Sequence, residues 1–155
     1  MKRKLAIEVI SGLLILLFVY TAVSKLLDFT TFHVQLSKSP FINAYANTVA
    51  WALPAGELLV ALALTFKRTR LLGLYASLFL MTMFTTYIYA MLHYSYYVPC
   101  SCGGVISKLS WTQHLWFNSG FVLLSIAGII LEAKNLRQPE TKTEELPAVV
   151  YAAMS

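Results

Sequence analysis

The sequence predicts an all-α integral membrane protein, an antiparallel four-helix bundle, and three observations lead to this fold class. First, 58% of the 155 residues are hydrophobic and only 12% are charged, whereas an average soluble domain carries about 25% charged residues. Second, four apolar segments are each long enough to cross a hydrocarbon core of ~30 Å. Third, the linkers between these segments are short, which favours successive helices packed side by side in opposite directions.

The predicted membrane domain comprises residues 1–138, and its four spans differ in polar content. The first span carries a single acid, Glu8, near its start, whereas the third has no charged residue at all. The second contains a proline, a glycine and a carboxylate close together, at Pro54, Gly56 and Glu57. The spans cover about 5–27, 49–66, 71–92 and 114–131.

The two ends of the chain need separate interpretations. The first span could be a cleaved signal peptide, because a basic start precedes an apolar run and Ala22-Val23-Ser24 resembles a cleavage site. The run is longer than the usual h-region of about 7–15 residues and contains Glu8, which favours a retained span. The polar tail, 139–155, is expected to be mostly disordered and cytoplasmic.

Basic residues predict the orientation in the membrane. Nine of the twelve Lys and Arg residues form clusters before the first span, between the second and third, and after the fourth. The positive-inside rule makes this side cytoplasmic and places both termini there, so that the loops 28–48 and 93–113 face outward. Because the clusters are short and flank spans, the net charge of +5 does not indicate nucleic-acid binding. The clustered residues are Lys2, Arg3, Lys4, Lys67, Arg68, Arg70, Lys134, Arg137 and Lys142.

The only two cysteines stand two residues apart in the second outward-facing loop, in Pro99-Cys100-Ser101-Cys102-Gly103-Gly104. A disulfide at this spacing requires a tightly constrained backbone, and strained disulfides are easily reduced. Closing so small a ring removes little chain entropy, so a purely structural bridge would stabilise weakly. We interpret Cys100 and Cys102 as catalytic cysteines of thiol–disulfide exchange, with a passive bridge or inert thiols as the alternative.

Two histidines flank the cysteine loop, His93 at the end of the third span and His114 at the start of the fourth. Either could transfer a proton or stabilise a thiolate, and an ordinary interfacial role is the alternative for both. Two thiolates and two imidazoles could also bind zinc or copper(I). The single residue between the cysteines makes tetrahedral coordination difficult, so no metal is predicted.

An intramembrane polar site is predicted around Glu57. An ionised carboxylate about nine residues into a span is costly unless it is paired or protonated. Lys25 could reach it from the first span, and Asp28 competes for the same ammonium. Pro54 has no backbone N–H, so one carbonyl about a turn before it lacks its helical donor. Because Gly56 has no side chain, we expect another helix to approach closely there. A structural ion pair and a site that binds a headgroup or carries a proton both remain open.

Aromatic residues gather toward the outer side of the predicted bundle. They would suit a quinone pocket, but an interfacial aromatic belt predicts the same set. In the fourth span, we expect the Asn118 side chain to form a hydrogen bond with another helix. The aromatic residues are Tyr87, Tyr89, Tyr94, Tyr96, Tyr97, Trp111 and Trp116.

Three motifs point to a family: Ser24-Lys25-Leu26-Leu27-Asp28-Phe29, Pro54-Ala55-Gly56-Glu57-Leu58, and the C-x-C-G-G sequence followed by Trp111-x-x-His114. With them, about residues 5–131 resemble the MauE branch of the DoxX-like membrane proteins. The resemblance implies a four-helix inner-membrane protein associated with redox chemistry. MauE-type members are linked to maturation of a disulfide-rich periplasmic enzyme, and DoxX-type members to a quinone-reducing complex.

These observations predict an inner-membrane thiol–disulfide oxidoreductase. A thiolate of a periplasmic thioredoxin-like or cysteine-containing protein would attack the disulfide, and electrons would pass to a quinone or another redox partner. The opposite direction of electron flow is equally compatible with the sequence. The main alternative is a non-catalytic membrane subunit or assembly factor that docks a partner protein. For either function, the bundle could work alone, as a homo-oligomer or in a larger membrane complex. A metal-handling membrane protein is the weaker alternative.

Overall fold

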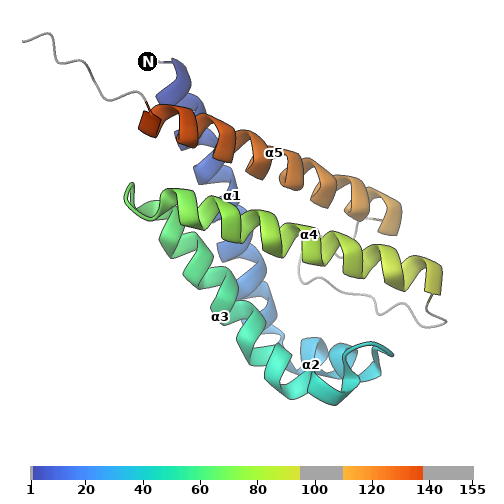
Figure 1. Ribbon diagram of the computed structural model, residues 1–155. Helices are drawn as coiled ribbons and strands as arrows, with labels where there is room; N and C mark the ends of the chain where they lie inside the picture. Colours follow the sequence, from blue (N-terminus) through green and yellow to red (C-terminus); the bar gives the residue numbers. More distant parts are fainter. Residues whose placement is uncertain (1, 95–109, 138–155) are drawn as a thin grey trace, which may run out of the picture.

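The computed structural model describes residues 2–94 and 110–137, without the Trp111 side chain, and its long elements are all α-helices (Figure 1). The predictions for the C-x-C motif, for two of the aromatic residues and for the tail therefore lie outside the described residues, and so does the prediction for the Trp111 side chain. Besides Trp111, the residues concerned are Cys100, Cys102, Tyr96, Tyr97 and 139–155.

Four long helices correspond to the predicted spans, and each begins one to three residues before its predicted start. All four are long and apolar enough to cross a membrane, α3 together with the short turn before it. An all-α, multi-pass membrane protein is thus confirmed, whereas the antiparallel order and the cytoplasmic termini stay predictions. The helices are α1, Lys2–Leu27; α3, Ala46–Thr65; α4, Arg70–Tyr94; and α5, Trp111–Arg137.

The first predicted loop contains a helix that was not predicted. Helix α2, Phe29–Lys38, follows α1 directly, and a 3-10 turn, Asn43–Tyr45, leads into α3. Phe32 and Leu36 of α2 are buried in one cluster with the first turns of α3. These two apolar residues stand four apart and therefore lie on the same face of the helix. Its ten residues are too few to span a bilayer, so a search for long apolar runs does not reveal it.

The helices pack most extensively in two pairs, α4 with α5 and α1 with α3, and α3 also packs against α4 (Figure 1). Leu14 and Phe18 of α1, Leu64 of α3, and Leu74 and Met81 of α4 are buried in the shared core. The outward surfaces expose large apolar side chains, which suits contact with a lipid bilayer. Examples are Leu16, Leu59, Phe79 and Leu123.

Two glycines permit the closest helix contacts, and neither is the predicted one. A Cβ on Gly73 would lie 2.9 Å from the backbone nitrogen of Leu64, and one on Gly128 would lie 2.8 Å from Leu74 Cδ2. Around Gly56, no atom from another described helix lies within 4 Å of the position a Cβ would take. The prediction that Gly56 allows close helix approach is therefore wrong, because the helix face that meets a neighbour cannot be identified from composition alone.

Candidate functional site

One end of the bundle contains an apolar cavity of about 480 Å³. Its walls come from the later half of α1, from α3 up to Glu57, from α4 from Met81 onward, from the earlier half of α5, and from α2 with the residues that follow it. The volume lies within the range of roughly 300–1,000 Å³ that small-molecule sites occupy. Aromatic and aliphatic side chains make up most of the wall, among them Leu17, Phe18, Phe32, Leu53, Met81, Phe84, Ile88 and Phe117.

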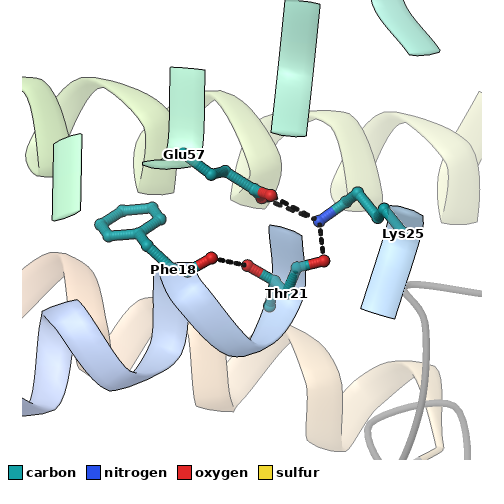
Figure 2. A network of polar contacts seen from close by, with 4 residues as sticks. All are labelled: Phe18, Thr21, Lys25 and Glu57. Carbon is teal, nitrogen blue, oxygen red and sulfur yellow. Dashed lines mark hydrogen bonds and ion pairs between the residues drawn. The ribbon is translucent and has the colours of Figure 1, made fainter. Parts of the chain in front are cut away.

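A buried ion pair lies in the wall of this cavity, between α1 and α3 (Figure 2). The Lys25 ammonium donates to both carboxylate oxygens of Glu57, at 2.8 and 3.1 Å, and to the Thr21 carbonyl at 3.3 Å. The two side chains are 8% and 0% exposed, respectively. The structure thus brings together the pair expected from the sequence, while a functional role for it stays a prediction.

Aromatic rings complete the surroundings of the Lys25 ammonium. Its nitrogen lies 6.0 Å from the ring centre of Phe32 on α2 and 5.8 Å from that of Phe84 on α4. Contacts of this length give weak cation–π attraction. Asp28 is exposed at the junction of α1 and α2, and no contact between it and Lys25 is found in the described part of the chain. The expected competition by Asp28 is therefore not observed.

Helix α5 contributes two buried polar side chains to the cavity, His114 and Asn118, which lie one turn apart.

The start of α5 is fixed by a capping box that was not predicted. Gln113 N donates to Ser110 Oγ at 3.4 Å, and Ser110 N donates to Gln113 Oε1 at 3.0 Å. These reciprocal bonds satisfy backbone donors that a helix start otherwise leaves free. The Ser110-x-x-Gln113 spacing is a signal that could have located this start.

The two histidines predicted to flank the cysteine loop have different surroundings. His114 is 7% exposed and lines the cavity, as Lys25 does. His93 is exposed, and its ring stacks on Tyr89 with centroids 4.2 Å apart. Its Nδ1 lies 3.0 Å from the Tyr89 carbonyl oxygen. Only His114 therefore belongs to the cavity.

The predicted aromatic set also divides. Tyr87 lines the cavity, and its hydroxyl donates to the buried Ser39 Oγ at 3.0 Å, joining α4 to the end of α2. Tyr89, Tyr94 and Trp116 are exposed, as expected of an interfacial belt. Ser39 and the wall of α2 were not predicted, because α2 itself was not.

The fold and the site define a multi-pass α-helical membrane protein whose helices enclose an apolar cavity beside a buried ion pair. The chain matches the family model described as methylamine utilisation protein MauE over residues 3–131. It therefore belongs to the MauE family. This confirms the MauE part of the resemblance, and the wider DoxX-like relationship stays a prediction. No curated protein and no solved structure matches the chain.

Proposed function

We propose that this protein is a thiol–disulfide redox protein of the bacterial inner membrane. It exchanges electrons through Cys100 and Cys102 with a thioredoxin-like or cysteine-containing protein in the periplasm. The main support is that the only two cysteines form a C-x-C motif in the segment between α4 and α5. That segment joins the two helices whose adjacent ends contribute to the cavity wall.

The first half-reaction oxidises the partner. A partner thiolate attacks one sulfur of the Cys100–Cys102 disulfide, the bond between these cysteines breaks, and a mixed disulfide forms. The second partner thiolate then attacks the mixed disulfide and releases the partner in its disulfide form. Two electrons and two protons have moved from the partner to the Cys100 and Cys102 dithiol.

The second half-reaction restores the disulfide. The chain has only two cysteines, so no second pair within it can accept these electrons. A membrane quinone takes up two electrons and two protons and becomes a hydroquinone, while the dithiol loses its two S–H bonds and forms the S–S bond. Another disulfide-bearing protein is the alternative oxidant.

Trapping of the mixed disulfide tests this function. Cys100→Ser and Cys102→Ser are prepared singly and together in the full chain, and the membranes are incubated with a thioredoxin-fold protein in its disulfide form. A single remaining thiolate can attack that disulfide and form the same mixed disulfide from the other direction. After alkylation, we expect one single variant to accumulate a covalent adduct on non-reducing gels and the double variant to form none. Ser101→Ala keeps both thiols and serves as the control that forms no lasting adduct.

The same variants decide between exchange and the rival function, a non-catalytic subunit or assembly factor. Membranes with the unchanged chain should oxidise the reduced thioredoxin-fold protein, and membranes with the double variant should not. Equal oxidation by both membranes would contradict a redox role of the cysteines and support a docking role.

A further inference from the structure

We propose that the cavity binds the headgroup of a membrane quinone and that the Asn118 side-chain amide donates a hydrogen bond to one quinone carbonyl. This inference rests on the proposed function, because thiol–disulfide exchange requires an acceptor for the two electrons of the dithiol. The proposed site itself consists of residues that line the cavity, and the cysteines are not among them. Quinone binding can therefore be tested in a chain without the cysteines.

The side-chain amide of Asn118 is a polar group of the cavity wall that a ligand can bind. The residue is 6% exposed and lines the cavity, and no hydrogen-bond partner of its amide is found within residues 2–94 and 110–137. Nearby hydroxyls of the same helix differ, because Ser119 and Ser125 donate to the carbonyls of Leu115 and Phe121. In the described part of the chain, the fully buried side-chain atoms without a partner belong to Ser11, Arg70 and Glu132, so the Asn118 amide is not sealed in the core but reaches the cavity that it lines. An apolar cavity offers this amide few partners, and an occupant with an acceptor at this point is therefore favoured.

The other polar groups of the wall are already engaged. The Lys25 ammonium has three N–H donors and three acceptor atoms within reach, namely both oxygens of Glu57 and the Thr21 carbonyl. The Thr21 hydroxyl donates to the Phe18 carbonyl, and Tyr87 donates to Ser39. The ion pair is neutral as a whole, which favours an uncharged ligand over a free ion.

A quinone matches this combination better than a lipid tail does. Its ring is flat and uncharged, and the aromatic side chains of Phe18, Phe84 and Phe117 in the wall can pack against it. Its carbonyl oxygen accepts from the Asn118 N–H, and after reduction the hydroquinone O–H can donate to the Asn118 carbonyl. An acyl chain offers no acceptor and would leave the amide unpaired.

Equilibrium binding of decyl-ubiquinone to the purified full chain in detergent tests the site. Decylbenzene, which has the same chain and no carbonyl oxygens, is the matched probe. We expect it to bind at least about tenfold more weakly than the quinone, and Asn118→Leu to weaken quinone binding by about tenfold, the effect of losing one hydrogen bond to a buried amide. Ser119→Ala, whose hydroxyl bonds within its own helix, should bind the quinone like the unchanged chain.

Equal affinity for both probes would mean that the cavity binds only acyl chains or detergent, and would overturn the proposal. Unchanged quinone affinity in Asn118→Leu would mean that the Asn118 amide is not the donor to the quinone carbonyl, and would overturn it as well. If Asn118→Leu does not fold, Ala52→Phe provides a second variant, because residue 52 lines the cavity and a larger ring there should reduce quinone binding. A photoreactive azidoquinone should label peptides of the cavity wall, and labelling confined to other peptides would also overturn the proposal.

The cysteine variants separate this inference from the proposed function. The chain with both Cys100→Ser and Cys102→Ser should bind the quinone with unchanged affinity. Unchanged binding together with no mixed disulfide from the single variants would leave the quinone site standing and reject the exchange reaction. Trapped adducts without quinone binding would support the exchange reaction and reject the quinone site, and would indicate that another protein oxidises the dithiol.

Discussion

The Lys25 ammonium lies 2.8 Å from Glu57 Oε1, and this bond joins α1 to α3 in the apolar interior (Figure 2). The pair brings the later half of α1 against the middle of α3, at the level where both helices line the cavity. Because either charge alone would be very costly in a bilayer, the two residues act as a unit.

Glu57→Gln should destabilise the protein strongly, because it leaves the buried Lys25 ammonium without its counter-charge. Breaking a buried pair in this way costs about 3–5 kcal/mol. Thermal unfolding in detergent should show a large decrease in midpoint for Glu57→Gln and a partial recovery when Lys25→Met is added. Glu8→Gln, at an exposed position of α1, is the control. A single variant as stable as this control would contradict the role of the pair.

Gly73→Ala and Gly56→Ala should have opposite effects on stability. At Gly73, the added Cβ would lie 2.9 Å from the backbone of Leu64, so α3 and α4 must move apart. At Gly56 the space is open, and alanine gains roughly 0.5–1 kcal/mol in helix propensity. Thermal unfolding of both variants gives the comparison. A loss of stability at Gly56 as large as that at Gly73 would show that the helix contacts are wrongly assigned.

Ser110→Ala should loosen the start of α5, because it removes the side-chain acceptor for Gln113 N. Loss of such a cap typically costs about 1 kcal/mol. Faster amide hydrogen exchange in the first turn of α5 is the expected result, with Ser110→Asn retaining most of the protection. Unchanged exchange in Ser110→Ala would argue against the capping box.

The predictable parts of the fold are those that depend on long segments or on isolated charges. Apolar runs indicate the four spans, and the ion pair was expected because Glu57 needs a partner that Lys25 can supply. Helix α2 was not predicted, since Phe32 and Leu36 are too few residues to distinguish a short helix from a loop.

The candidate site was only partly predictable, because the orientation of a side chain depends on how its helix packs. His93 and His114 stand symmetrically in the sequence, and only the packing of α5 turns His114 inward. The i, i+4 spacing of His114 and Asn118 places both on one helix face, a signal that was available from the sequence. Which glycine meets a neighbouring helix depends on the rotation of each helix about its axis, which the sequence alone does not determine.

The reduction potential of the Cys100 and Cys102 pair in native membranes tests the proposed redox function most directly. Membranes are equilibrated in glutathione redox buffers, and the thiols are then alkylated with a reagent that shifts the protein on a gel. A redox-active pair should titrate above about −300 mV, whereas structural disulfides lie below that value. A pair that stays oxidised in all these buffers, or never forms a disulfide, would contradict thiol–disulfide exchange.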